Sequence, residues 1–266
     1  MTLITSRTNP AVKAARRLAA GPAGGRSPAF LVEGPSAVGE ALDHLTRLLV
    51  TPRAAAQHPG LVAEARAAGV EVLQVADPVL ATVAATVTPR GLVGVAILPP
   101  ASLDAVLDAA TLTIVLVQAG DPGNAGAIIR TADAAGADAV VLTRGSVDPR
   151  NPKAVRASAG SLFHLPVVPD ASLESVLSRG RDRGLQLVAA APRAGTSYLE
   201  LDLTRPSALL FGSEAHGLAN DVVSRCDAAA RVPIHGHAES LNLAATVAVI
   251  AYEAARQRRR WEGGQP

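Results

Sequence analysis

The sequence predicts an α/β protein with two domains, the second of them a parallel β-sheet covered by helices on both faces. Short apolar strands alternate with amphipathic helices along most of the 266 residues. A proline-containing break at Leu98 to Ser102 interrupts this alternation. Beyond the break the strands are strongly apolar, as expected for strands with both faces buried. We therefore expect a first domain over residues 1–97, a linker over 98–110 and a second domain over 111–266.

The first domain has the pattern of a small α/β/α layer. Near its start, Val12, Ala15 and Leu18 form a short helical stripe that continues into the apolar run Phe30 to Val32. The spacing of apolar residues then predicts two helices and three strands. In chain order they are a helix over 36–45, a strand over 47–50, a helix over 61–68, and strands over 70–75 and 92–96.

The second domain opens as a βαβ unit. A short helix over 103–109 leads to a buried strand over 113–118, a helix over 125–135 and a strand over 139–143. The remaining elements are a helix over 172–183, strands over 185–190, 208–211 and 231–234, and a long last helix over 241–260.

Composition excludes several classes of protein. Hydrophobic residues make up 48% of the chain and charged residues 18%, which supplies packed cores and argues against a disordered protein. No apolar run approaches the roughly 20 residues of a membrane-spanning helix, so we expect no membrane association. The single Cys226 can form neither an internal disulfide nor a cysteine-based metal cluster. These features favour a cytoplasmic protein.

The N-terminal stretch has two interpretations. Its first 32 residues contain five basic side chains and no acidic one, a profile that resembles an organelle transit peptide. The Asn9-Pro10 pair interrupts the stretch, and the helical stripe that follows this pair leads into the first apolar run. These observations favour a basic, partner-facing start of the first domain.

The use of arginine points to a nucleic acid partner. The formal net charge is only +2, but Lys occurs only at positions 13 and 153 among 25 basic residues. Arginine forks suit phosphate, although a genome-wide bias toward Arg would give the same count. The basic residues cluster over 7–26, 144–156 and 256–260. Because aromatic residues make up only 2% of the chain, a contact with RNA would rest on phosphate charge and shape.

Ligands of a parallel sheet bind outside the carboxyl ends of its strands, where three polar, glycine-containing segments fall. The first is Asp121 to Gly126, which leads into the helix that carries Arg130. Its glycines are spaced by three, so the dinucleotide fingerprint G-x-G-x-x-G is absent and a nicotinamide dehydrogenase is disfavoured. From spacing alone, Asn124 fits a helix cap and Arg130 a member of a surface ion pair.

The second segment is Phe211 to Leu218. Gly212 and Gly217 flank Glu214, which permits close approach of a ligand to the backbone while one carboxylate is presented. A solvated glutamate in a turn is the alternative. His216 fits a turn residue better than a metal ligand.

The third segment is Val232 to Asn242, in which Ser240 is a natural N-cap of the last helix. A Ser-His-Asp hydrolase would use such a serine, but the chain has no G-x-S-x-G elbow. His235 and His237 lie close together without an evident third ligand, so we expect no metal site.

Together, and in this order, the three segments resemble the motifs of the SpoU, or TrmH, family of RNA ribose 2′-O-methyltransferases. Asp121 to Arg130 resembles the first motif, Leu210 to Leu218 the second, and Val232 to Asn242 the third. The stretches Ser6 to Lys13 and Phe30 to Gly34 resemble the substrate-binding domain of the ribosomal-RNA members. The resemblance thus covers nearly the whole chain.

The resemblance implies a C-terminal α/β-knot methyltransferase domain, in which the parallel sheet is tied in a trefoil knot, preceded by a smaller α/β/α substrate-binding domain. It implies S-adenosylmethionine as the cofactor, held mainly by backbone groups at Gly212, Val232 and Leu241, and no metal. A glycine at position 212 would leave the backbone open to the cofactor. His216, next to Ala215, lies in a stretch where glycine or another small residue is common in the family; this difference could reshape the pocket rim but removes no catalytic group.

The implied reaction is attack of a ribose 2′-hydroxyl on the sulfonium methyl group, with loss of a proton. By the family's pattern Arg130 meets that hydroxyl. There it either assists the deprotonation of the hydroxyl or stabilises the oxyanion. A guanidinium is a poor base, so we favour stabilisation of the oxyanion and leave the identity of the proton acceptor open. Asn124, Glu214, Ser240 and Asn242 are expected to shape and orient the site. The family usually works as a homodimer with residues of both subunits near each site.

The first domain favours ribosomal RNA of the 23S type over transfer RNA as the substrate, since transfer-RNA members of the family generally carry only short extensions. A methyltransferase conferring antibiotic self-resistance would have the same motifs. A non-catalytic RNA-binding protein on the same fold is the main alternative from another class. The presence of all five expected catalytic residues favours the enzyme.

Overall fold

The computed structural model describes residues 2–19, 28–84, 86, 88–98 and 101–263. The chain forms two compact units. The first comprises Met1–Pro99 with Arg150–Phe163, and the second comprises Pro100–Pro149 with His164–Pro266. The second unit is therefore interrupted once by a short segment that belongs to the first.

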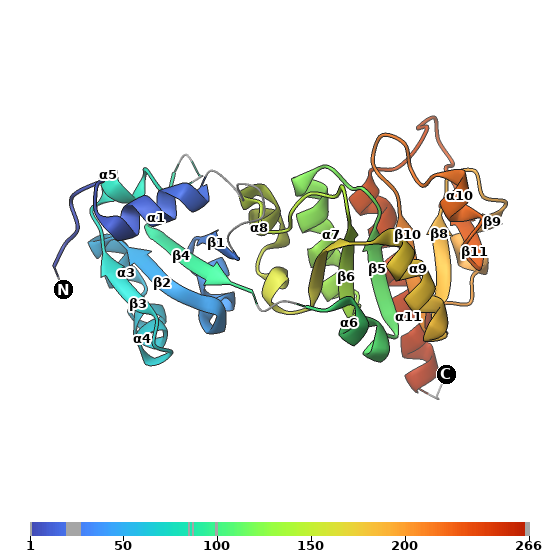
Figure 1. The fold of residues 1–266 in the computed structure, drawn as a ribbon, viewed down its shortest axis with the longest axis horizontal. Coiled ribbons are helices and arrows are strands. Elements are labelled where there is room, and N and C mark those ends of the chain that lie inside the picture. The colour runs from blue at the N-terminus through green and yellow to red at the C-terminus, as the bar shows by residue number, and fades with distance from the viewer. Residues whose placement is uncertain (1, 20–27, 85, 87, 99–100, 264–266) are drawn as a thin grey trace. The chain divides into compact units, whose positions relative to one another are not determined.

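The first unit is built on a four-stranded mixed sheet with the strand order β1-β4-β2-β3 (Figure 1). Strand β4 pairs antiparallel with β1 and β2, and β3 pairs parallel with β2. The strands are β1 (Ala29–Glu33), β2 (Leu45–Val50), β3 (Glu71–Gln74) and β4 (Leu92–Ile97).

Most helices of the first unit begin at a proline, whose missing N–H and fixed φ suit the first helical position. They are α1 (Pro10–Ala19), α2 (Pro35–Glu40), α3 (Pro52–Gln57), α4 (Pro59–Ala67), α5 (Asp77–Leu80) and α8 (Pro152–Ser158). The helix predicted over 36–45 is too long, because Leu45 already pairs with Ala96 in the sheet. Phe163 stacks on Phe30 with ring centroids 6.0 Å apart, which ties the segment 150–163 to this unit.

The second unit is built on a seven-stranded sheet with the order β7-β6-β5-β10-β8-β11-β9. Its paired strands are all parallel, which confirms the predicted parallel sheet. Strands β5, β6 and β10 are buried at every residue. The strands are β5 (Leu112–Leu116), β6 (Ala139–Thr143), β7 (Val167–Ala171), β8 (Gln186–Ala190), β9 (Thr196–Ser197), β10 (Ser207–Phe211) and β11 (Ala228–Arg231).

The strand predicted over 231–234 is wrong, because β11 ends where that prediction begins. The neighbouring strands β8 and β9 end at Ala190 and Ser197, opposite Ala230 and Arg231, and so provide no further partner. Pro233 also lacks an N–H for a sheet hydrogen bond. Residues 232–234 therefore belong to the loop that leads to the last helix.

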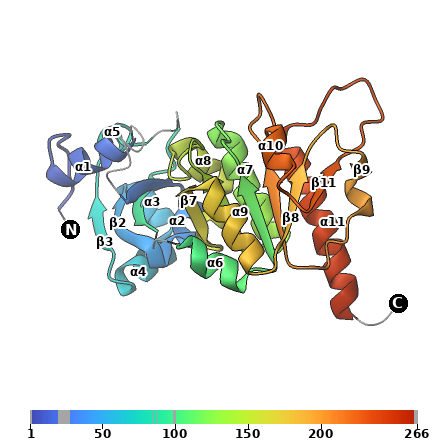
Figure 2. The same ribbon diagram turned by 45° about the vertical axis from the view of Figure 1, so that its right-hand side comes forward.

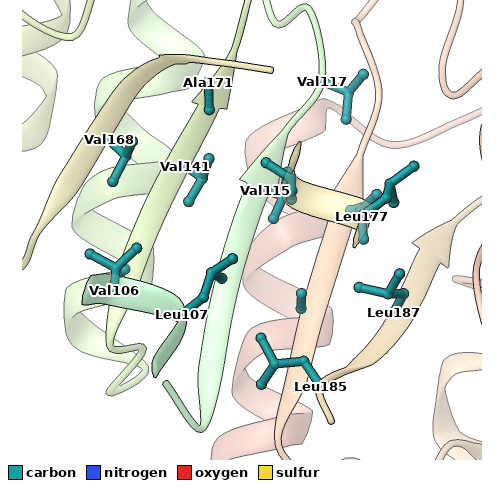
Figure 3. Packing of buried hydrophobic residues seen from close by; sticks show 14 of the residues in the cluster. Val106, Leu107, Val115, Val117, Val141, Val168, Ala171, Leu177, Leu185 and Leu187 are labelled. Carbon is teal, nitrogen blue, oxygen red and sulfur yellow. The ribbon is translucent and has the colours of Figure 1, made fainter. Parts of the chain in front are cut away.

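Helices cover the sheet of the second unit (Figure 2). Helix α7 packs against α11, and α6 packs against α9. In strand β5, Val115 faces the core beneath α6 and α9 (Figure 3), and its neighbours Ile114 and Leu116 point to the other face. The helices are α6 (Leu103–Ala109), α7 (Pro122–Ala134), α9 (Leu173–Asp182), α10 (Asn220–Val223) and α11 (Leu243–Gly263). No helix in the described ranges is long and apolar enough to cross a membrane.

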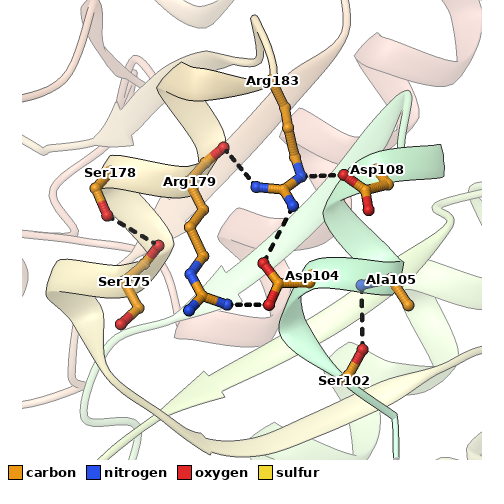
Figure 4. Close-up of polar contacts among 8 residues, drawn as sticks. All are labelled: Ser102, Asp104, Ala105, Asp108, Ser175, Ser178, Arg179 and Arg183. Carbon is orange, nitrogen blue, oxygen red and sulfur yellow. Dashed lines mark hydrogen bonds and ion pairs between the residues drawn. The ribbon is translucent and has the colours of Figure 1, made fainter.

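An exposed ion-pair network joins α6 to the end of α9 (Figure 4). Asp104 accepts hydrogen bonds from Arg179 and, at 3.1 Å, from Arg183, which also pairs with Asp108. Arg179 and the two aspartates are exposed and Arg183 is half-buried, so solvent screening keeps each of these pairs weak. The network links α6 to α9, and the buried side chains of Val106 and Leu107 hold α6 on the apolar core.

Two arginines of the C-terminal basic cluster hold the fold together. Arg258 donates to the backbone oxygens of Thr111 at 2.7 Å, Leu203 at 2.9 Å and Arg205 at 3.0 Å. Arg256 donates to the buried carboxylate of Glu253 at 2.7 and 2.5 Å. The cluster over 256–260 is therefore partly engaged within the second unit; the side chain of residue 260 lies outside the described residues.

Candidate active site

The first two polar segments meet because β5 and β10 are neighbours in the sheet. These strands run parallel with Leu116 opposite Phe211, and the N–H of Val117 donates to the carbonyl of Phe211 at 2.8 Å. Their carboxyl ends lie at one edge of the sheet. The loops 117–121 and 212–218 therefore leave the sheet side by side.

Three hydrogen bonds from the first loop fix the carboxylate of Glu214. Its Oε2 accepts from the N–H of Gly120 at 3.2 Å. Its Oε1 accepts from the N–H of Asp121 at 3.3 Å and from the side-chain amide of Asn124 at 2.9 Å. Burial is the largest single effect and raises the pKa of Glu214. The hydrogen bonds from Asn124 and from backbone N–H groups each lower the pKa, and their combined effect exceeds that of burial. The pKa is thus below its usual value, and Glu214 is an ionised carboxylate and a poor proton acceptor at neutral pH.

Asn124 is not the N-cap of α7, contrary to the interpretation from spacing. Asp121 caps this helix, because its Oδ1 accepts from the N–H of Asn124 at 2.8 Å. The pair Asp121-Pro122 is a sequence signal for this arrangement, since proline is favoured directly after an N-cap. The side chain of Asn124 is therefore available to contact other segments.

Asn242 connects the third segment to the first two. Its Oδ1 accepts from the N–H of Ala244 at 2.8 Å, so it caps α11, while its Nδ2 donates to Oδ1 of Asn124 at 3.1 Å. The backbone donor fixes the orientation of the Asn242 amide, and this in turn directs the amino group of Asn124 toward Glu214. We call this chain of contacts, from Asn242 through Asn124 to Glu214, the amide relay.

Ser240 does not cap the last helix. The helix begins at Leu243, two residues later than predicted, and Asn242 takes the capping role. Ser240 and Leu241 lie in the preceding loop, where Ser240 is exposed and Leu241 is 39% exposed. The amide relay therefore brings together three of the five predicted catalytic residues and leaves Ser240 outside.

Arg130 is also outside the amide relay. It lies on α7 six residues after Asn124, which corresponds to roughly 9 Å along the helix axis. Its side chain is exposed and makes no hydrogen bond or ion pair with the part of the chain that the structure describes. The expected surface ion pair does not form within that part, and the guanidinium is available to a ligand.

The structure gives a different reason for the glycine at position 212. A Cβ placed there would lie 2.0 Å from the carbonyl carbon of Gly217 and 2.2 Å from the backbone nitrogen of Leu218. The loop folds back on itself, with the N–H of Gly217 donating to the carbonyl of Ser213 at 2.8 Å. Gly212 is thus required by close packing of the loop's own backbone, whereas we had expected it to leave room for a ligand.

The backbone of the loop 232–241 is available for hydrogen bonds to a ligand. None of its N–H or carbonyl groups makes a hydrogen bond to the described residues, and in the chain it connects the end of β11 to the start of α11. Val232 is half-buried, and the side chains of Ile234 and Leu241 are 38% and 39% exposed. This loop combines free hydrogen-bonding groups with apolar side chains.

Comparison with known families covers both units. The model of the SpoU rRNA Methylase family matches residues 111–252, more than half of the chain. The chain belongs to the SpoU rRNA methylase family. A second model, the MRM3-like substrate binding domain, matches residues 9–94. The resemblance inferred from the motifs is confirmed, and the parallel α/β fold of the second unit is that of a methylase.

Full-length relatives extend the comparison to the whole chain. An uncharacterized tRNA/rRNA methyltransferase of Synechocystis is 35% identical over 99% of this chain and 96% of its own length. The 23S rRNA (guanosine(2553)-2′-O)-methyltransferase RlmP of Bacillus subtilis is 33% identical over 84% of this chain and 87% of its own. The crystal structure of an AdoMet-bound rRNA methyltransferase from Sinorhizobium meliloti has a TM-score of 0.86 and 33% identity, covering 96% of this chain and 97% of that one.

Proposed function

We propose that this SpoU family member transfers a methyl group from S-adenosylmethionine to a ribose 2′-hydroxyl of RNA. The proposed substrate is ribosomal RNA of the 23S type, and transfer RNA is the alternative. The amide relay carries this proposal, because it joins three motif segments at the carboxyl edge of a parallel sheet in a chain of this family. The match to a substrate binding domain over residues 9–94 and the likeness to RlmP favour ribosomal RNA.

The residues present fit S-adenosylmethionine. The loop 232–241 offers unpaired backbone groups and the half-exposed side chain of Leu241, which suit the polar and adenine parts of the cofactor. Val232 and the backbone at Gly212 complete the proposed binding residues. When bound, the cofactor supplies an electrophilic methyl group on a positively charged sulfur. We further propose that the chain around this loop is tied in the trefoil knot of the family.

Each polar residue has a separate role in this proposal. Arg130 stabilises the negative charge that develops on the ribose 2′-oxygen as the hydroxyl proton passes to solvent water, since the guanidinium has no described internal partner to neutralise it. Glu214 fixes the two loops and takes no proton, because its pKa is lowered. Asn124 and Asn242 hold Glu214 in place, and Ser240 contacts the substrate from the loop before α11. No metal ion is needed for these steps.

The proposed assembly is a homodimer in the cytoplasm. Ile234 and Leu241 expose apolar surface in the loop that leads to Asn242, and a second copy covering this loop would place residues of both subunits near each site. The cytoplasmic location follows from the proposed ribosomal RNA substrate.

Methylation of a 23S ribosomal RNA transcript with labelled S-adenosylmethionine tests the function. Nuclease digestion should place the label on a ribose 2′-oxygen, and Asn124→Ala should abolish most of the transfer. Arg53→Gln, an exposed change on α3 of the first unit, is the control and should retain activity. A label on a base, or none with transcript and cofactor present, contradicts the proposal.

A further inference from the structure

Helix α1 presents three cations on one face. Its N-terminus is capped by Asn9, whose Oδ1 accepts from the N–H of Ala11 at 2.9 Å. Lys13, Arg16 and Arg17 are exposed, and at 3.6 residues per turn they fall within an arc of about 100°. Arg7 is exposed just before the helix. Four exposed cations therefore lie between Arg7 and Arg17 in the chain.

These cations have no counter-charge in the described part of the chain. Lys13, Arg16 and Arg17 make no ion pair or side-chain hydrogen bond there, and no acidic residue occurs before Glu33. Arg47 of the same unit behaves differently, because it is paired with Glu71 at 2.5 Å. The charge on α1 is therefore not taken up by an ion pair or a side-chain hydrogen bond within the described residues.

The face is held by a rigid support. Val12 and Ala15, on the opposite side of α1, are fully buried in the core of the first unit. The segment before the helix is fixed at the sheet edge, since the N–H of Ile4 donates to Gln74 and its carbonyl accepts from Ala76, both at 2.9 Å. The cations thus project from a helix that is anchored at its start and along its length.

We propose that this face of α1 binds the phosphate backbone of the RNA substrate, an inference that rests on the proposed function. Beside the cations, the outward side of the helix carries only Pro10 and Ala14, which are short and leave the charges accessible. The absence of an aromatic or large apolar anchor among these described positions disfavours a protein partner. Phosphate contacts of this kind position RNA without reading its sequence. The face would therefore supply affinity and orientation, and the second unit would supply chemistry.

The test is the salt dependence of binding to a 23S ribosomal RNA transcript, measured by filter binding with full-length protein. Each lost phosphate contact lowers the slope of log K against log salt by about 0.7 to 0.9. The variant K13Q/R16Q/R17Q should therefore lower it by about 2 to 3. Between 50 and 200 mM salt, wild-type affinity should fall roughly 20- to 40-fold more than that of the variant.

The matched control is R47Q/R53Q/R66Q, which removes the same charge from other elements of the first unit. It should keep the wild-type slope within about 1. The charge-conserving variant K13R/R16K/R17K should also keep the wild-type slope, which would show that helix α1 tolerates substitution at these three positions. In methylation assays the α1 variant should raise the KM for RNA at least tenfold and leave the single-turnover rate at saturating RNA unchanged.

Two outcomes overturn the proposal: an α1 variant with the wild-type slope, or equal losses in both glutamine variants, which would indicate only net charge. If the α1 variant fails to fold, the single changes Lys13→Gln, Arg16→Gln and Arg17→Gln decide the question by slope changes of about 0.7 to 0.9 each. A wild-type protein that binds the transcript but transfers no methyl group refutes the proposed function, and the slopes still decide the role of α1.

Discussion

Replacing Asn242 with Asp separates helix capping from the orientation of Glu214. Asp caps helices about as well as Asn, so an oxygen remains for the N–H of Ala244. The amino group that donates to Asn124 is replaced by a second oxygen. The Asn124 side chain has one donor end and one acceptor end, so it cannot satisfy carboxylates on both sides. In the Asn242→Asp variant, one oxygen must therefore face another.

The size of the effect follows from the bond that is lost. A hydrogen bond to a charged group contributes about 1.5 to 3 kcal/mol, and the partial exposure of Glu214 places its bond from Asn124 at the lower end. If that bond orients the site, methyl transfer should slow about tenfold, since about 1.4 kcal/mol corresponds to a factor of ten. Asn242→Ala instead removes the cap and should cost about 1 kcal/mol of folding stability.

The two variants should therefore rank oppositely in stability and activity. Urea unfolding followed by circular dichroism should find Asn242→Asp more stable than Asn242→Ala. Single-turnover transfer of labelled methyl to a 23S ribosomal RNA transcript should find Asn242→Asp no faster than Asn242→Ala. Wild-type transfer by Asn242→Asp would show that the amide relay does not orient the site. An Asn242→Asp protein less stable than Asn242→Ala would refute the assigned cap.

Three further predictions concern single residues of the site. Arg130→Ala should change the unfolding free energy by less than about 0.5 kcal/mol because the side chain is exposed, yet slow methyl transfer roughly 10²- to 10³-fold. Calorimetry should still detect cofactor binding to this variant, and Arg130→Lys should restore only part of the rate. A wild-type rate in Arg130→Ala would remove Arg130 from the mechanism. Gly212→Ala should lower stability and cofactor affinity together, since its Cβ would lie 2.0 Å from Gly217, and Gly195→Ala, whose Cβ meets nothing within 4 Å, should change neither. The lowered pKa of Glu214 stabilises the fold at pH values above the ordinary pKa of a glutamate, and this stabilisation is lost as the pH falls through the folded-state pKa. Urea unfolding of Glu214→Gln between about pH 5 and 3 should therefore show a shallower decline than the wild type, and parallel curves would contradict the assigned hydrogen bonds.

Much of the second unit could be predicted from its sequence because apolar spacing alone determines its buried elements. The helix over 103–109 and the strand over 139–143 match α6 and β6 to the residue. Strand β7 (Val167–Ala171) escaped prediction because its burial does not alternate and Asp170 adopts φ +55°, so no regular period marks it. The segment 150–163 joins the first unit through contacts such as the stacking of Phe163, which local spacing does not encode.

The capping residues of the site also could not all be assigned from local sequence. Asp121 and Asn124 are both good N-caps three residues apart, and the proline after Asp121 distinguishes them. Ser240 and Asn242 are also both suitable, and no proline follows either. Which one caps depends on where α11 packs against α7, a tertiary property. The amide relay could therefore be assembled only from the fold, although each of its residues was predicted to belong to the site.

Arginines that look alike in the sequence differ in what the fold leaves for them to do. Arg258 donates to three backbone oxygens and closes the second unit, so replacing it should destabilise the protein. Arg130 contacts none of the described acceptors. A group that stabilises a developing oxyanion must be unpaired before the substrate arrives, because an internal carboxylate would neutralise its charge and compete with the substrate. Arg130 has no partner among the described residues, so its guanidinium is available for the role proposed for it, whereas the guanidinium of Arg258 is already engaged in the fold.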